Sequence, residues 1–186
     1  MKRALNMILA ATLAVGAMGS AFAGSNGNRS GDARLEQRLY GEVHHALAMI
    51  PQFTVFDHLA YGVNGGTVTL YGQVRDAFVK DVAEKSVKRL EGVERVDNRI
   101  EVLPASFNDD RIRSRVAFAV FNDPRLSRYA MDPLPPIHII VKNGHVDLQG
   151  VVRTQTDKDS AFIRANGVSG VFSVENHLQV EQPNRG

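Results

Sequence analysis

The chain has 186 residues, enough for one medium domain or two small ones, and 44% hydrophobic and 23% charged residues are ordinary for a globular protein. Its 22 basic residues face 20 acidic ones, and without Lys2 and Arg3 the balance is even, which argues against a general nucleic-acid binder. The lack of cysteine excludes thiol catalysis, disulfides, cysteine zinc sites and an acylated lipoprotein cysteine.

Residues 1–23 have the three parts of a secretory signal peptide. A basic start is followed by an apolar run over residues 7–15, and Ala21-Phe22-Ala23 offers small residues at the −3 and −1 positions. The run is shorter than the ~20 residues that span a bilayer. We therefore expect cleavage after Ala23, export to the periplasm and no transmembrane span. The polar, glycine-rich residues 24–31 are expected to form a flexible linker.

The rest of the chain repeats itself. Residues 67–75 resemble residues 145–153 at an offset of 78, and this register continues without a gap to the end of each copy. Two copies are too few for a solenoid, so the repeat predicts two domains, at residues 32–104 and 107–182, followed by a short tail at 183–186.

The first copy reads helix, strand, strand, helix, strand. An apolar stripe every fourth residue, Leu35, Leu39, Val43 and Leu47, predicts the first helix. Two alternating segments flank Gly65-Gly66 and predict a hairpin with Val63 opposite Val68 and Tyr61 opposite Leu70. A second helix follows Asp76, a candidate N-cap, and the last strand alternates from Val96 to Val102.

The second copy has the same order. A type I′ turn at Asn143-Gly144 places Ile139 opposite Leu148 and Val141 opposite Val146, so that all four share one face. The helix after Thr154, its candidate N-cap, carries Ala161, Phe162 and Ala165 as its predicted core positions. The fold class is α+β: two tandem α-β-β-α-β domains, each a three-stranded mixed sheet with two helices on one face.

Both copies share a spaced pattern, Gly-x-Val-x-Leu-x-Gly-x-Val followed by Gly-Val-x-x-Val-x-Asn-x-(Leu/Ile)-x-Val. Its residues are Gly66, Val68, Leu70, Gly72, Val74, Gly92, Val93, Val96, Asn98, Ile100 and Val102, and then Gly144, Val146, Leu148, Gly150, Val152, Gly170, Val171, Val174, Asn176, Leu178 and Val180. This pattern resembles the BON domain. An exported tandem pair is similar to the osmotically inducible periplasmic proteins and the envelope-maintenance proteins of that family. The resemblance implies a non-enzymatic envelope-stability protein that contacts phospholipid, a membrane surface or envelope proteins.

Six residues of this pattern are expected to be structural: Gly72, Gly92, Asn98, Gly150, Gly170 and Asn176. The glycine of each middle strand faces the core, where a missing side chain lets a helix approach. The later glycine of each copy marks the turn out of a helix. Each asparagine lies on an apolar face and is expected to hydrogen-bond a neighbouring loop backbone.

The sequence offers no catalytic or metal-binding constellation. His44 and His45 are adjacent on a helix and point in different directions, His138 lies out of register with His145, and no zinc-type histidine spacing occurs. No serine lies at a strand-to-helix elbow. We therefore predict no catalytic residue, no metal and no cofactor.

One basic face stands out on the first helix of the second copy. Arg111, Arg115 and Phe118 share this face at i, i+4 and i+7, with Phe121 nearby. Arginines beside exposed aromatic rings suit anionic lipid headgroups. The alternative is a solvated face whose arginines pair with the neighbouring carboxylates of Asp109, Asp110 and Asp123.

Two functions remain open. The first is an envelope-stability protein that associates with anionic phospholipid through Arg111, Arg115, Phe118 and Phe121. The second is a periplasmic protein-interaction or chaperone-like module that binds envelope proteins or other polypeptides through sheet edges and residues 123–136. That segment belongs to no motif, and its neighbourhood is rich in apolar residues, namely Phe121, Leu126, Tyr129, Met131 and Leu134.

Overall fold

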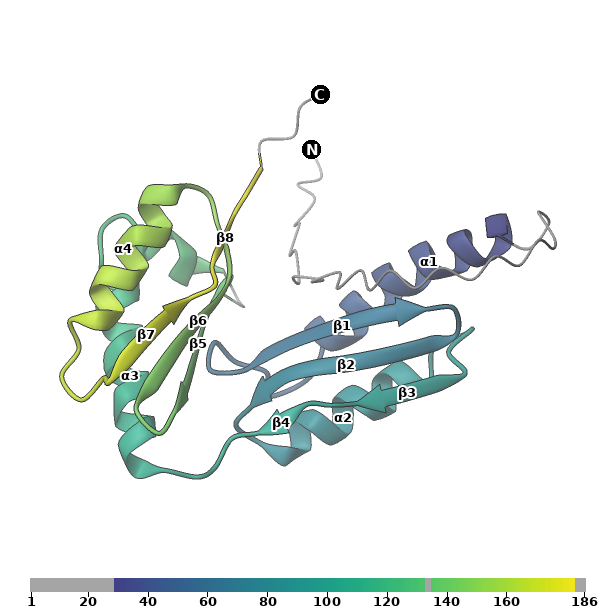
Figure 1. The fold of residues 1–186 in the computed structure, drawn as a ribbon, viewed down its shortest axis with the longest axis horizontal. Coiled ribbons are helices and arrows are strands. Elements are labelled where there is room, and N and C mark those ends of the chain that lie inside the picture. The colour runs from purple at the N-terminus through teal and green to yellow at the C-terminus, as the bar shows by residue number, and fades with distance from the viewer. Residues whose placement is uncertain (1–28, 133–134, 183–186) are drawn as a thin grey trace, which may run out of the picture.

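The computed structural model describes residues 29–132 and 135–182. The first domain contains α1 (Arg29–Ala48), β1 (His58–Asn64), β2 (Thr67–Val74), α2 (Ala77–Lys88), β3 (Arg95–Asn98) and β4 (Glu101–Val102). The second contains α3 (Phe107–Phe121), the 3-10 helix η1 (Ser127–Met131), β5 (Ile137–Lys142), β6 (His145–Val152), α4 (Gln155–Asn166), β7 (Ser173–Asn176) and β8 (Gln179–Val180) (Figure 1). The predicted signal peptide, its cleavage site and the tail lie outside the described residues. The helix α1 begins at Arg29, within the predicted linker.

The α+β fold class and the tandem arrangement are confirmed. In each domain the first two strands form an antiparallel hairpin, and the helices pack on one face of the sheet (Figure 1). The expected third strand is divided into two short segments, both parallel to the middle strand: β3 and β4 beside β2, and β7 and β8 beside β6. Each mixed sheet therefore contains four strand segments where the sequence pattern predicted three strands.

The predicted hairpin registers are confirmed in both domains. Val63 lies opposite Val68 and Tyr61 opposite Leu70, while Val141 lies opposite Val146 and Ile139 opposite Leu148. Asn143 and Gly144 both have positive φ, as a type I′ turn requires, whereas in the first hairpin only Gly65 does. Turn chemistry and hydrophobic alternation therefore set the same register.

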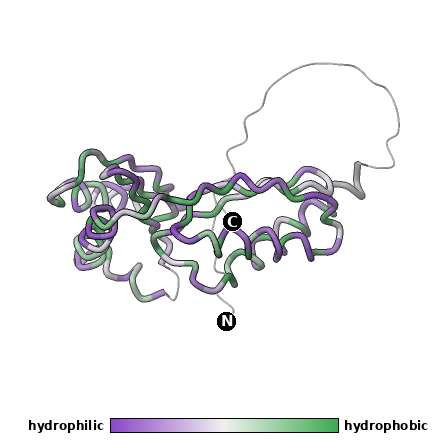
Figure 2. Tube along the Cα trace, turned by 90° about the horizontal axis from the view of Figure 1, so that it is seen from below, coloured by the Kyte–Doolittle hydropathy of each residue, from purple (hydrophilic) through white to green (hydrophobic). Residues whose placement is uncertain are grey.

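Each domain has its own hydrophobic core between the helices and one sheet face. Figure 2 shows the two domains lying next to each other along the long axis of the molecule. The first core contains Val43, Leu47, Ile50, Leu59, Val68, Leu70, Val74, Val79, Ala83, Val87 and Ile100. The second contains Ile112, Val116, Val120, Leu126, Tyr129, Ile137, Ile139, Val141, Val146, Leu148, Val152, Ala161, Ala165 and Leu178.

Two apolar features of the second domain differ from the sequence interpretation. Leu126 and Tyr129 are buried in the domain's own core, so much of the apolar content of residues 123–136 serves packing rather than a free binding loop. Phe162 of α4 is 38% exposed, and only Ala161 and Ala165 of the predicted set are buried. Met131, another apolar residue of the segment 123–136, is in contrast 86% exposed.

Candidate functional site

Local sequence fixes the position of α3. Ser106 is its N-cap, because the hydroxyl accepts a hydrogen bond from the Asp109 backbone N–H at 3.2 Å. Ile112, Val116 and Val120 are buried against the sheet. This leaves Arg111 and Arg115 on the outward side of the helix, where both are exposed.

Neither outward arginine forms an ion pair with a residue that the structure describes. The Arg111 guanidinium donates to Asn108 Oδ1 at 3.4 Å, and that of Arg115 to the Ser169 carbonyl at 3.5 Å. The acidic partners proposed as an alternative are engaged elsewhere. Asp110 pairs with Arg113, and the hydrogen bonds of Asp123 from the Arg125 backbone N–H and the Arg164 guanidinium hold the pKa of its carboxyl below the usual value. The charges of Arg111 and Arg115 are therefore available to an outside partner.

The two predicted aromatic contacts lie in different environments. Phe118 is 71% exposed beside the arginines, one turn further along the helix. Phe121 is only half-buried at the helix end and packs against the second core, with Val120 as its buried neighbour. The structure thus brings together Arg111, Arg115 and Phe118 on one outward face and turns Phe121 toward the interior.

Two exposed phenylalanines at the N-terminal end of α3 were missed from the sequence. Phe107, the first residue of the helix, is 95% exposed, and Phe172, before β7, is 76% exposed. The Asp109 carboxylate accepts the backbone N–H groups of Asn143 and Gly144 at 2.9 and 2.8 Å, so the hairpin tip lies against this end of the helix. The Phe172 ring packs beside Gly144. We call Phe107, Arg111, Arg115, Phe118 and Phe172 the α3 surface.

The first domain provides an internal comparison. At the offset of 77 that relates the first helices, Arg34 and Arg38 correspond to Arg111 and Arg115, whereas Ser30 and Gly41 replace two of the phenylalanines. At the offset of 78, Glu94 replaces Phe172. A comparison of the two copies would therefore have revealed the missed residues.

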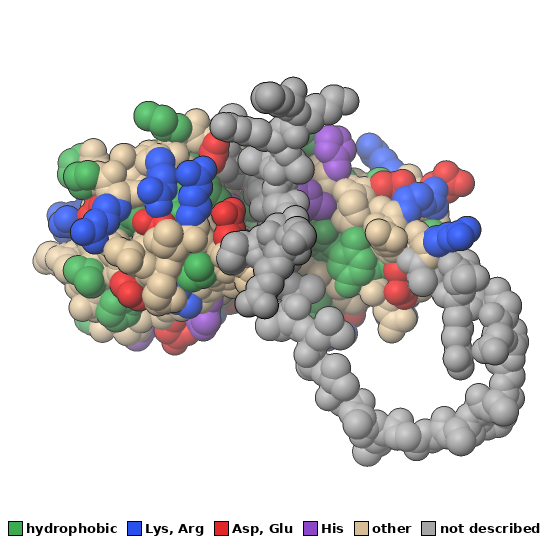
Figure 3. All heavy atoms as spheres, turned by 90° about the horizontal axis from the view of Figure 1, so that it is seen from above, with side chains coloured by type: hydrophobic (Ala, Val, Ile, Leu, Met, Phe, Trp, Pro, Cys, Tyr) green, Lys and Arg blue, Asp and Glu red, His purple; other side chains and the backbone are tan. Residues whose placement is uncertain are grey.

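The electrostatic setting also differs between the copies. Arg38 lies within 3.9 Å of the Glu42 carboxylate and 3.6 Å of that of Glu91. The second domain has Ala119 and Ser169 at these two positions. In Figure 3, Lys and Arg side chains are visible on both domains, and those on the second domain have hydrophobic and acidic side chains near them. Arg38 thus has two carboxylates close to it, whereas its counterpart Arg115 has none among the described residues.

The motif glycines are required by backbone geometry. Gly72 and Gly150 have φ of +116° and +115°, and a Cβ there would lie 2.0 Å from the carbonyl oxygens of His58 and Pro136. These acceptors belong to the neighbouring strand or its approach, which corrects the expectation that a helix makes the close approach. Gly92 and Gly170 also have positive φ, +90° and +96°, in the turns that follow α2 and α4.

The motif asparagines join the last strands to the helices. Asn98 Nδ2 donates to the Lys80 carbonyl at 3.2 Å, and Asn176 Nδ2 donates to the Lys158 carbonyl at 2.9 Å. The acceptors lie within α2 and α4, not in a loop as expected from the sequence. The Oδ1 atom of each asparagine accepts the backbone N–H two residues ahead, at the point where the strand is interrupted.

No constellation for metal chemistry occurs in the part of the chain that the structure describes. Among these residues, no three or more His, Asp or Glu side chains are grouped so as to hold a metal ion. The helices that the structure describes include none that is both long and apolar enough to cross a bilayer. The arrangement supports contact through a surface, with two cations and exposed aromatic rings as its chemical means.

Comparisons with known proteins give the following matches. The outer membrane lipoprotein DolP of Haemophilus influenzae is 37% identical over 114 residues, which are 59% of this chain and 55% of that protein. The chain thus spans about half the length of this curated relative. Two solved structures of CdsD, a structural protein of the type III secretion system of Chlamydia trachomatis, are also similar. The first has 12% identity and a TM-score of 0.30 over 79% of this chain and 94% of that one. The second, of the C-terminal domain of CdsD, has 14% identity and a TM-score of 0.28 over 77% of this chain and 98% of that one.

The family model described as the BON domain matches residues 36–104 and again residues 108–182. These two matches cover more than half of the chain and include both α-β-β-α-β units, with the spaced glycines and asparagines whose backbone roles are described above. The chain belongs to the BON-domain family, as a tandem pair of these domains.

Proposed function

We propose that this protein is a non-enzymatic component of the bacterial envelope whose second domain binds anionic phospholipid through the α3 surface. The observation that carries the proposal is the contrast between the two copies: both keep the two arginines, but only the second has exposed phenylalanines around them and no carboxylate against them. The name of the curated relative, an outer membrane lipoprotein, supports an envelope location. In this proposal the signal peptide is cleaved after Ala23 and the mature chain acts in the periplasm.

The expected affinity is low. Each arginine near an anionic surface contributes about 1 kcal/mol, and burial of one exposed phenylalanine adds roughly 1–2 kcal/mol. Two arginines and one or two rings give about 3–6 kcal/mol, which corresponds to dissociation constants from several millimolar to tens of micromolar. Because the Debye length is ~8 Å at physiological salt, only direct contacts with headgroups remain effective. We therefore expect weak, reversible and salt-sensitive binding.

Vesicle co-sedimentation tests the proposal. The wild-type protein should sediment with phosphatidylcholine vesicles that contain phosphatidylglycerol and not with phosphatidylcholine alone. Arg111→Gln together with Arg115→Gln removes two charges and should weaken binding ~30-fold, since 1.36 kcal/mol is a factor of ten. The corresponding glutamate pair should abolish binding. The thermal midpoint should stay nearly unchanged, because both side chains are exposed.

The first domain supplies the matched control. Arg34→Gln with Arg38→Gln removes the same charges from the equivalent helix and also removes the bond from Arg38 to the Glu91 carbonyl, the counterpart of the Arg115 contact. This variant should sediment like the wild type. Equal loss in both variants would indicate a general charge effect, and undiminished sedimentation of the Arg111/Arg115 glutamate pair would refute the proposed site.

The chaperone-like alternative loses part of its basis. Leu126 and Tyr129 of residues 123–136 are buried in the second core, and the edge of β5 is engaged by the first domain, where the Ile139 backbone N–H donates to the Val55 carbonyl at 2.7 Å.

A further inference from the structure

The strand β5 is buried on both faces. Ile139 and Val141 face the second core, whereas His138 and Ile140, on the opposite face, are also only 3% and 2% exposed. The equivalent residues of β1 are Ala60 and Gly62, which are only half-buried. At these two positions the large side chains occur only in the second domain, where the outer face of the strand is covered.

The first domain covers this face with the segment that precedes β1. The Phe53 ring lies 5.6 Å and the His58 ring 6.1 Å from the His138 ring, centroid to centroid. Phe56 packs against the second core. The Ile139 backbone N–H donates to the Val55 carbonyl at 2.7 Å, so one backbone hydrogen bond joins the edge strand of the second sheet to the first domain. This junction is therefore apolar and aromatic at its centre.

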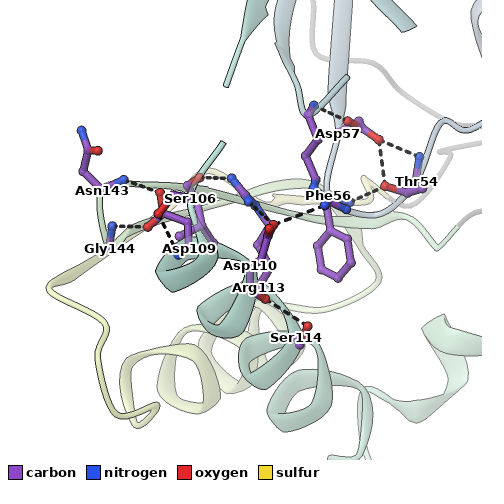
Figure 4. A network of polar contacts seen from close by, with 12 residues as sticks. Thr54, Phe56, Asp57, Ser106, Asp109, Asp110, Arg113, Ser114, Asn143 and Gly144 are labelled. Carbon is purple, nitrogen blue, oxygen red and sulfur yellow. Dashed lines mark hydrogen bonds and ion pairs between the residues drawn. The ribbon is translucent and has the colours of Figure 1, made fainter. Parts of the chain in front are cut away.

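Polar contacts surround the centre. The Arg75 guanidinium of the first domain lies 3.2 Å from Asp110 Oδ1, which also accepts from Arg113 at 2.7 Å (Figure 4). Lys142 of the second domain pairs with Glu101 of the first at 2.5 Å. These pairs carry opposite charges at neutral pH and favour contact between the domains.

The two histidines are the groups at this junction that can change charge under mild acid. His138 Nδ1 is buried and has no hydrogen-bond partner among the described residues. The pKa of His138 is lowered to about 4, mainly by burial and also by the neighbouring His58, while the backbone of Asp57 and Thr54 opposes the shift. Burial also lowers the pKa of His58, against the attraction of Asp147 on β6.

The carboxylates that face the pair are already engaged. Asp57, 2% exposed, accepts from the Arg75 backbone N–H at 2.7 Å and from the N–H and hydroxyl of Thr54 (Figure 4). Asp147 lies 2.7 Å from His177 Nδ1, a neighbour that is itself titratable, and also accepts from Gln149. Both carboxylates thus already accept hydrogen bonds from other groups, and the attraction of Asp147 offsets only part of the effect of burial on His58.

We propose that His58 and His138 form an acid-released latch: the domains stay docked while both rings are neutral, and protonation separates them with each domain still folded. Separation would uncover Ile140, His138, Phe53 and the edge of β5. The proposal does not depend on the lipid-binding function. It assigns a role to a histidine pair whose second-domain member, His138, is replaced by Ala60 at the equivalent position of β1.

The direction of the pH effect follows from the lowered pKa. The undocked ring takes up a proton near pH 6.5, whereas the docked ring stays neutral to about pH 4. Docking is therefore at full strength above pH 6.5 and weakens as the pH falls from about 6.5 to 4. The protonation of His138 alone should lower the equilibrium constant for docking of the two domains ~30-fold between pH 7.5 and pH 5.

Resonance energy transfer between the domains tests the latch. Because the chain has no cysteine, Lys88→Cys on α2 and Ser114→Cys on α3, both at exposed positions, give two defined dye sites. Transfer in the labelled full-length protein should change between pH 6.5 and 4, while far-UV circular dichroism stays constant. His138→Phe keeps an aromatic ring against Phe53 and should remain docked to pH 4.5. His45→Gln, at an exposed position on α1, is the control and should behave like the labelled parent.

Three results would overturn the proposal. One is the same pH profile for the parent and His138→Phe. Another is a loss of circular dichroism that follows the loss of transfer, which would mean acid unfolding. The third is a histidine NMR titration of the unsubstituted protein in which His138 takes up its proton near 6.5, a measurement that needs no variant.

Discussion

At the scale of single residues, Gly72 and Gly150 show how a repeated glycine can be read correctly as structural and yet for the wrong reason. The spacing predicted a small residue on the core-facing side of a strand. The structure shows that the constraint is twofold: φ lies near +115°, and a Cβ would meet a backbone carbonyl 2.0 Å away. Because the carbonyl belongs to the backbone of the neighbouring strand or its approach, no side-chain movement relieves the clash.

Gly150→Ala should therefore destabilise the second domain by about 2–4 kcal/mol, from backbone strain and the displaced strand together. Gly41→Ala is the matched control, since Gly41 lies in α1 with no atom within 4 Å of the added Cβ. That change should stabilise the first domain by about 0.5–1 kcal/mol, because alanine is the better helix former. Urea denaturation of both variants measures the difference. A Gly150→Ala protein as stable as the wild type would contradict this geometry.

At the scale of elements, local chemistry predicted most of the fold. Both hairpin registers and the caps at Asp76 and Thr154 depend on residues close in sequence, and all are present as expected. Three features depend on contacts between distant segments, and sequence periodicity does not report these. They are the burial of Leu126 and Tyr129, the docking of residues before β1 on β5, and the division of the last strand.

The candidate site, like the fold, was predictable where it depends on local sequence and not where it depends on contacts between distant segments. Helical spacing placed Arg111, Arg115 and Phe118 on one outward face, and the structure places them there. Spacing could not place Phe121, because it lies at the end of α3, where the following residues turn back over the core. Phe172 lies far along the chain, and only the tertiary contact with the hairpin tip brings it to the start of α3.

Asn176 sets the division between β7 and β8, and this role can be tested. Its side chain links the strand to the Lys158 carbonyl of α4 and to the Leu178 backbone N–H. Asn176→Ala should cost about 1–2 kcal/mol, the value of two modest hydrogen bonds less the water that replaces them. Asn176→Asp should cost more, because a carboxylate would face the Lys158 carbonyl oxygen. Chemical denaturation measures the stability of both variants. An Asn176→Asp protein more stable than Asn176→Ala would refute the assigned hydrogen bond to the Lys158 carbonyl.

At the scale of the whole molecule, the two copies share a fold but have different surroundings. The second domain has its α3 surface exposed and the outer face of β5 covered, and the first domain provides the cover through residues 53–58. Asp110 belongs to α3 and is shared between Arg75 of the first domain and Arg113 of the second. The domain junction therefore contacts the same helix that carries the proposed lipid site.

Docking makes the stability of the second domain depend on the first, and Leu70→Ala measures this dependence. Leu70 is fully buried in the first core, and its truncation should cost about 2–5 kcal/mol there. In mild denaturant the first domain of this variant should unfold while the second persists. The Ile139 amide should then lose its protection from hydrogen exchange, because its acceptor is the Val55 carbonyl of the first domain. Amides of β6 should stay protected, since their partners lie within the second sheet.

The equivalent change, Leu148→Ala, separates docking from general weakening. Leu148 is also fully buried, so the loss of core packing should be similar, but it falls in the second domain. The amides of β1 and β2 in the first domain should then stay protected from exchange, since the core of that domain contains no residue of the second.

Protection at Ile139 that survives when the first domain of the Leu70→Ala variant is unfolded would show that the junction contributes nothing to β5. Loss of protection at Ile139 alone, with β6 unaffected, is the result that docking of the first domain on this strand requires.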